Sequence, residues 1–307
     1  MPSAALRVIR PLIRIGSFIA PRTAGRAAFR LFCTPPRQPG SDTRSGKAIQ
    51  GARSRLAPAQ RQAVPYACGS VSTYLFEPEA GLQDVAQEGL RDEAGPAPTV
   101  ILLHGWNSEA AFMTAFVAPL LAAGFRVVAY DMPAHGASTG AELNIPLGVA
   151  SLAAVARVFA PVHAIVTHSF GGAIALAALA GSVPGEPRIK ARRLALISAP
   201  SSIATITRNF GATIGLGRRG QAALEKRIHS VAGNPVEVFE GREQLAGIGL
   251  PTLVIHDRQD RELDFHHAEA LAAAGPFVTL EATGGLGHRR ILQAKSVVES
   301  VTRFVVG

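Results

Sequence analysis

The chain has 307 residues, of which 48% are hydrophobic, and a formal net charge of +9 at pH 7. At this length we expect either two domains or one large α/β domain, because α/β chains commonly form single domains of about 250 residues. The sequence excludes a membrane-spanning helix, since no apolar run reaches about 18 residues, and its two cysteines exclude a disulfide framework.

The positive charge is confined to the start of the chain. Residues 1–64 contain twelve Lys or Arg and one acidic residue, whereas residues 65–307 contain 19 basic and 21 acidic residues. We therefore divide the chain into a basic N-terminal arm with a linker, residues 1–64, and a nearly neutral domain, residues 65–307.

Several interpretations of the arm remain open. Between residues 6 and 19 apolar side chains are interleaved with arginines, which predicts a short amphipathic helix interrupted near Pro11. We favour an extension that packs on the domain or stays partly ordered. The alternatives are peripheral membrane contact through residues 1–30, organellar targeting and nucleic-acid contact. Nothing else in the chain supports nucleic-acid binding, so we expect no nucleic-acid partner.

The elements of a mostly parallel sheet follow the arm. Residues 39–62 are rich in Gly, Ser, Arg and Gln and are predicted to be linker, residues 71–76 an antiparallel strand, and residues 77–98 a long hairpin loop. Short apolar runs then recur at 99–103, 127–130, 162–166, 194–198, 252–256 and 277–280. Helical segments separate most of these runs. Because the runs are apolar throughout rather than alternating, the fold class is α/β, with helices covering both faces of the sheet.

A long insertion interrupts the alternation of strands and helices at residues 201–249. Apolar residues at helical spacing predict two short amphipathic helices, which would form a small cap over the carboxyl edge of the sheet. We expect the apolar faces of the cap to line a substrate pocket, through Ile203, Ile206, Phe210, Leu224 and Ile228. The alternative is that these residues only hold the cap to the core.

Ser169 lies where an apolar strand meets Gly171, Gly172 and a helix-forming stretch. A serine on such a sharp strand-to-helix turn projects from the backbone, and the next amide N–H points toward charge that develops beside it. Asp257, Asp260 and His288 follow later apolar runs, and an open α/β sheet brings the carboxyl ends of its strands together at one edge. The order Ser, Asp, His therefore indicates acyl transfer through a serine.

These motifs resemble the α/β-hydrolase superfamily, in its serine hydrolase branch. The resemblance covers residues 98–307 and rests on His104-Gly105-Trp106, the Asp131–Ser138 motif, the turn around Ser169, Asp260, and Gly287-His288. One position departs from the usual pattern, because Thr167 stands where the family usually has glycine. The resemblance implies an α/β-hydrolase fold, with Ser169 as nucleophile, His288 as base and the backbone N–H groups of Trp106 and Phe170 as oxyanion hole.

Two carboxylates compete for the acid of the triad. Asp257 directly follows the strand and would bond the amides of its own turn, whereas the resemblance places the acid at Asp260. Nine histidines compete for the role of base, and we favour His288. Arg289 and Arg290 lie beside it at a helix start, where cations oppose the helix dipole and are not favoured by stability. A local rule broken in this way indicates a functional site. We expect His168 to pack below the turn rather than act as a base.

The resulting hypothesis is a cytoplasmic serine esterase that acts on a small or medium apolar acyl substrate and needs no metal or cofactor. One alternative is a membrane-surface lipid hydrolase or thioesterase recruited by the arm. Another is a non-catalytic member of the fold that binds a ligand. The substrate and the oligomeric state stay undetermined from the sequence.

Overall fold

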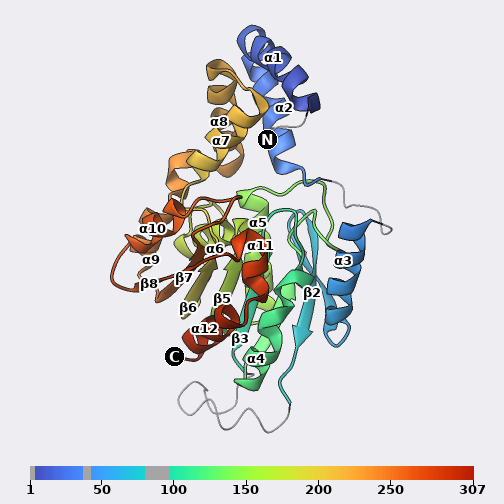
Figure 1. Cartoon of the computed structure of the whole chain (residues 1–307), viewed down its shortest axis with the longest axis vertical. Coiled ribbons are helices and arrows are strands. Elements are labelled where there is room, and N and C mark those ends of the chain that lie inside the picture. The colour runs from blue at the N-terminus through green and yellow to red at the C-terminus, as the bar shows by residue number, and fades with distance from the viewer. Residues whose placement is uncertain (1–3, 37–42, 80–96) are drawn as a thin grey trace.

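The computed structural model describes residues 4–36, 43–79 and 97–307 (Figure 1). In this part of the chain one sheet has eight strands, in the order β1-β2-β4-β3-β5-β6-β7-β8. The strands are β1 (Gln60–Tyr66), β2 (Gly69–Phe76), β3 (Thr99–Leu103), β4 (Arg126–Tyr130), β5 (Val162–His168), β6 (Arg193–Ile197), β7 (Thr252–Asp257) and β8 (Val278–Thr283). Strand β2 is antiparallel to β1 and β4, and all later pairings are parallel.

Helices cover both faces of the sheet, as the uniformly apolar strands predict. One face packs against α5 (Ile145–Val158), α6 (Phe170–Ala180), α9 (Gly241–Ile248) and α10 (His266–Ala272). The other packs against the 3₁₀ helix η2 (Ala110–Phe116), α4 (Val117–Ala122) and α12 (Lys295–Val306). Alternate residues of β3 enter opposite cores, Ile101 the first and Leu102 the second, and both are fully buried. The predicted α/β-hydrolase architecture is confirmed.

A group of four helices projects from the carboxyl edge of this sheet (Figure 1). It combines α7 (Ile203–Ile214) and α8 (Arg218–Ala232) of the insertion with α1 (Ala4–Ile19) and α2 (Pro21–Cys33) of the arm. Helix α1 also bonds α7, because the Arg10 guanidinium donates to the Ala212 carbonyl over 3.1 Å. The interruption expected near Pro11 is wrong, since α1 runs through it. A proline removes one helical hydrogen bond, and tertiary packing of the helix offsets that loss.

The expected linker at residues 39–62 is also wrong wherever the structure describes it. Helix α3 (Arg44–Arg53), the 3₁₀ helix η1 (Ser54–Leu56) and the start of β1 occupy this segment. Ala52 and Leu56 are buried in the core beside η2. Arg53 forms an ion pair of 2.7 Å with the buried Glu109. These contacts come from distant residues, so the polar composition of the segment did not reveal them. The expected loop at 77–98 lies mostly outside the described residues.

Substitution of Gly25 tests how closely the arm packs on the insertion. A Cβ there would lie 2.6 Å from the Ala223 carbonyl carbon, so Gly25→Ala should force α2 away from α8 at a cost of about 1–3 kcal/mol. Gly16→Ala is the matched control, because nothing lies within 4 Å and alanine favours a helix by roughly 0.5–1 kcal/mol. Denaturant unfolding and trypsin cleavage of the arm would measure both. Equal stability of the two variants would contradict this account.

Candidate active site

Ser169 stands on a strained turn between β5 and α6. Its φ of 50° and ψ of −125° are unusual for a residue with a side chain, and strain of this kind concentrates at functional sites. The two glycines that follow permit the turn. A Cβ on Gly171 would lie 2.5 Å from the His104 carbonyl oxygen, and one on Gly172 would lie 2.6 Å from the Ala199 Cβ. Thr167 fits because its buried hydroxyl donates to the Ala195 carbonyl of β6 over 3.0 Å.

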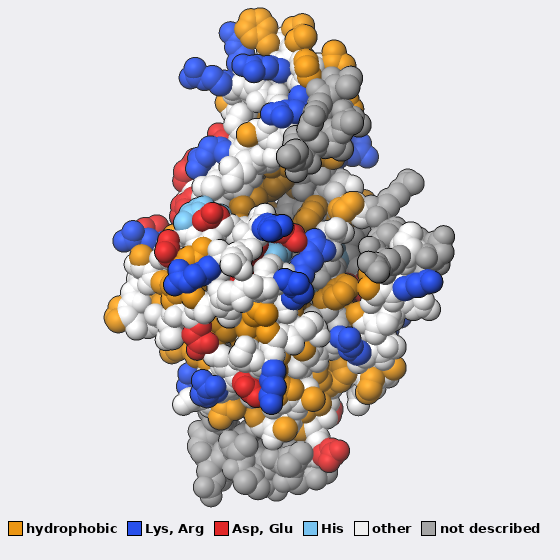
Figure 2. Space-filling model, viewed as in Figure 1, with side chains coloured by type: hydrophobic (Ala, Val, Ile, Leu, Met, Phe, Trp, Pro, Cys, Tyr) orange, Lys and Arg blue, Asp and Glu red, His pale blue; other side chains and the backbone are white. Residues whose placement is uncertain are grey.

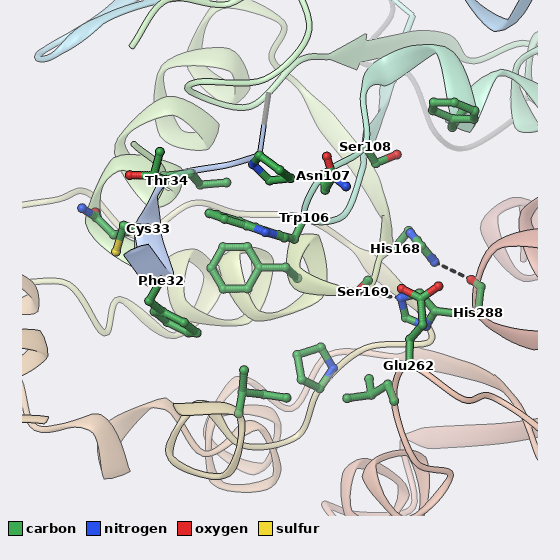
Figure 3. Close-up of a pocket in the computed structure, with 18 of the residues that line it drawn as sticks. Phe32, Cys33, Thr34, Trp106, Asn107, Ser108, His168, Ser169, Glu262 and His288 are labelled. Atoms are coloured by element: carbon green, nitrogen blue, oxygen red, sulfur yellow. Dashed lines mark hydrogen bonds between the residues drawn. The ribbon is translucent and has the colours of Figure 1, made fainter. Parts of the chain in front are cut away.

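His288 lies between Ser169 and Asp260, and Figure 3 shows the end of its ring that faces Ser169. Its Nδ1 lies 2.7 Å from Asp260 Oδ2, and its Nε2 lies 3.0 Å from Ser169 Oγ. An ionised carboxylate only accepts hydrogen bonds, so Nδ1 carries the proton in the neutral ring. Nε2 is then the acceptor that faces the serine hydroxyl. The structure thus brings together the three residues that the sequence indicated.

Asp260 is the better placed of the two candidate acids. Its side chain is fully buried, and its Oδ1 accepts from the Glu262 and Leu263 amides over 2.8 and 2.9 Å. Burial alone would raise the pKa of Asp260, but hydrogen bonds from His256, His288 and the Leu263 amide outweigh burial and lower it. The carboxylate is therefore held ionised beside His288.

Asp257 holds the loops of the site instead. Its carboxylate accepts from the Gln259 amide, the Thr283 hydroxyl and the Leu286 amide, each over 2.9 Å. The last bond ties the end of β7 to the segment that leads into His288. None of these bonds reaches the His288 imidazole, and the bonding of Asp257 is that of a turn-fixing residue.

The loop after β3 passes directly against the serine turn. A Cβ on Gly105 would lie 2.8 Å from the Ser169 Cβ, so glycine permits this approach. Trp106 follows Gly105 in this loop, and its ring lies edge-on to the Phe170 ring with centroids 6.0 Å apart. The Phe170 amide opens α6 and has no intrahelical acceptor there. Neither the Phe170 amide nor the Trp106 amide donates a hydrogen bond within the described part of the chain. Two backbone donors in this arrangement would suit a developing oxyanion.

A buried polar network fixes that loop. His104 accepts from the Met132 amide over 2.9 Å through Nε2, which leaves Nδ1–H to donate to the Gly105 carbonyl over 2.7 Å. Burial lowers the pKa of His104 well below its ordinary value, so the ring is neutral. Asp131 Oδ1 accepts from the Ala110 amide over 2.8 Å. These motif residues act on the position of the loop rather than on a substrate.

His168 makes a contact that no sequence pattern indicated. Its ring is buried, as expected, and its Nε2–H donates to the His288 carbonyl over 2.8 Å (Figure 3). Burial and the neighbouring His288 lower its pKa to about 3. The hydrogen bond from this neutral ring therefore joins the backbone of His288 to the turn that carries Ser169.

A cavity of about 1350 Å³ opens beside Ser169. Ile203, Ile206, Phe210 and Ile228 line it as expected, but Leu224 does not. Leu224 is fully buried and instead meets α2, where Gly25 lies against its backbone nitrogen. The predicted pocket omitted the arm residues that line the cavity. They include Phe29, Leu31, Phe32 and Cys33 of α2. Their spacing along one helical turn was the signal that could have indicated them.

Other kinds of site find little support in the described residues. No group of three His, Cys, Asp or Glu side chains in residues 4–36, 43–79 and 97–307 is arranged to hold a metal ion. Within the same ranges, no helix is long and apolar enough to cross a membrane.

Comparison with known proteins gives a family and a fold. The model of the alpha/beta hydrolase family matches residues 100–300. No curated protein sequence matches the chain. Similar solved structures include esterase RhEst1 from Rhodococcus sp. ECU1013, 17% identical with a TM-score of 0.55, over 81% of this chain and 98% of that one. A bromoperoxidase from Bacillus anthracis is 16% identical with a TM-score of 0.56, over 81% and 100%. A bacterial membrane phospholipase A is 17% identical with a TM-score of 0.57, over 84% and 90%.

Proposed function

The chain belongs to the alpha/beta hydrolase family, and we propose that it is a serine hydrolase that cleaves carboxylic esters with an apolar acyl chain. The observation that carries the proposal is the hydrogen-bonded series Ser169–His288–Asp260, of which Ser169 and His288 line a largely apolar cavity. Fold alone would not assign a reaction, because similar structures include an esterase and a bromoperoxidase.

The proposed reaction runs through an acyl-enzyme. Ser169 Oγ attacks the ester carbonyl while His288 Nε2 takes its proton, and Asp260 stabilises the imidazolium that forms. The Trp106 and Phe170 amides bind the negative oxygen of the tetrahedral intermediate. The imidazolium then protonates the leaving alcohol. Water, deprotonated by the same nitrogen, attacks the acyl-enzyme and releases the acid and the serine. Because serine holds the nucleophile position, hydrolysis through an aspartyl ester is disfavoured.

The lining of the cavity suggests what kind of substrate would fit. Phe29, Phe32, Phe210, Ile228 and Val231 provide an apolar wall that suits an acyl chain. Polar residues also line the cavity and would suit the alcohol side of an ester: Asn107, Ser108, Glu262 and Arg289, of which Glu262 lies beside His288 in Figure 3. Glu262 and Arg289 neutralise each other, since the guanidinium donates to both carboxylate oxygens over 2.9 and 3.2 Å.

Thioesters, lactones and peptides are the other acyl compounds that the same groups would attack, and they stand behind esters in this proposal. A non-catalytic ligand-binding protein is the alternative from another class. It would bind an acyl compound but would not react with a fluorophosphonate, which requires an activated serine.

Replacing members of the triad tests the mechanism directly. Ser169→Ala should lower kcat for a nitrophenyl ester by a factor on the order of 10⁶ and abolish fluorophosphonate labelling. His288→Ala should cost nearly as much, and the double variant little more, because the two groups act as one unit. Labelling that survives in Ser169→Ala would reveal a different nucleophile, and additive losses would show that the two residues do not cooperate.

The two aspartates should respond differently to the same substitution. Asp260→Asn should lower kcat by roughly 10⁴, because the amide favours the wrong imidazole tautomer. Asp257→Asn removes acceptors from the Thr283 and Leu286 bonds and should mainly lower the free energy of unfolding. Steady-state kinetics and denaturant unfolding of both variants would measure the pair. The reverse ranking would transfer the role to Asp257.

Chain length tests the apolar wall. Each buried methylene should add up to about 0.8 kcal/mol, so kcat/KM should rise from acetyl toward medium-chain nitrophenyl esters. Phe210→Ala should shift this optimum. Leu224→Ala is the matched control, since Leu224 is buried away from the cavity and its loss should lower stability without moving the profile. A steady fall from acetyl in the unchanged protein would rule out the apolar acyl pocket.

A further inference from the structure

Helix α1 presents an apolar face to solvent. Five of its large apolar side chains are exposed, by 47% to 75%: Ile9, Leu12, Ile15, Phe18 and Ile19. They recur at helical spacing, so they lie on one broad side of α1. Elsewhere in the described residues, large exposed apolar side chains occur singly, as at Val158 and Val306. We call the five residues the α1 face.

The charged residues of the two arm helices are all cationic. Helices α1 and α2 contain six arginines and no acidic residue: Arg7, Arg10, Arg14, Arg22, Arg26 and Arg30. Arg14 is exposed on α1, and Arg22, Arg26 and Arg30 are exposed at four-residue spacing along α2. Arg219 of α8 lies over the Phe18 ring, 4.6 Å from its centre. Figure 2 shows the apolar and basic side chains gathered at the end of the molecule that the four helices form.

We propose that the α1 face docks on an anionic lipid surface. A helix with apolar side chains on one side and arginines beside them lies in the plane of a membrane interface, with the apolar side buried and the cations at the headgroups. Anionic headgroups supply the negative charge that α1 and α2 lack. The helix has 16 residues, so it lies on the bilayer rather than across it.

A second copy of the chain fits the α1 face less well. Pairing two such faces would bury the apolar side chains, but it would also bring two sets of arginines together without an acidic partner on α1 or α2. Like charges placed opposite one another across an interface are strongly unfavourable. The charge pattern therefore favours lipid.

The cavity lies at the other end of the same helix pair. At the carboxyl end of α2, Phe29, Phe32 and Cys33 line the cavity, and Leu31 is both 57% exposed and part of its lining. A docked chain would thus present its acyl cavity to amphiphiles held in the same lipid surface. This connection rests on the proposed function, whereas docking itself does not.

Vesicle co-sedimentation of the full chain tests the proposal. The probes are vesicles of phosphatidylcholine alone and vesicles of equal parts phosphatidylcholine and phosphatidylglycerol. The chain should sediment with the anionic vesicles only, and added salt should release it. Repeating the measurement with Ser169→Ala prevents consumption of lipid and separates docking from hydrolysis, because docking needs no nucleophile.

Two variants and one control locate the docking surface. Leu12→Glu with Ile15→Glu should weaken binding to anionic vesicles by roughly tenfold or more for each side chain. Arg22→Ala with Arg26→Ala should weaken it about fivefold for each cation. Val158→Glu with Val306→Glu introduces the same charge at similarly exposed positions outside the arm and should leave binding unchanged. Thermal unfolding of each variant establishes that the fold is retained.

Three results would overturn the proposal. One is failure of the unchanged chain to bind anionic vesicles. Another is an equal loss of binding in the control and in the Leu12→Glu, Ile15→Glu variant. The third is a concentration-dependent dimer in light scattering that the α1 substitutions abolish, because the occupant of the α1 face would then be a second copy. Loss of esterase activity with binding retained would count only against the proposed function.

Discussion

The buried carboxylate of Asp260 fixes the arrangement on which the rest of the site depends. It stays ionised although it is fully buried. The Glu262 and Leu263 amides donate to it, and His256 and His288 lie beside it. Its contact with Nδ1 decides which nitrogen of His288 carries the proton. That choice leaves Nε2 free to accept from Ser169. A parallel sheet is required as well, because β5, β7 and β8 must end at the same edge for the three groups to meet.

Contacts behind Ser169 and His288 hold three loops in fixed positions relative to one another. His168 bonds the backbone of His288, Asp257 bonds the segment before it, and Gly105 lies against the serine turn. Each contact joins a loop to another loop rather than to solvent. A displacement of one loop by about 1 Å would therefore change the distance between Ser169 and His288. Positioning errors of that size are costly in catalysis.

Sequence reasoning identified the sheet and the residues at its edge because both leave local signals. Uniformly apolar runs mark buried parallel strands, and the glycines after Ser169 mark a close approach. In the arm the signal was weaker, namely the spacing of Phe29, Phe32 and Cys33 along one helical turn. Periodicity showed that Leu224 and Ile228 face inward, yet it did not say against what, and only Ile228 reached the cavity. Likewise α3 is polar in sequence, so its place beside η2 followed from tertiary contacts alone.

The apolar wall of the cavity is built by two segments that lie far apart in the chain. Phe32 of the arm and Phe210 of the insertion pack against each other in it, with ring centres 4.9 Å apart. A chimera that exchanged only residues 201–249 with another hydrolase would keep half of this wall and lose the partner of the other half. Under the proposed function, substrate preference would therefore be a shared property of arm and insertion, and the two would have to be transplanted together.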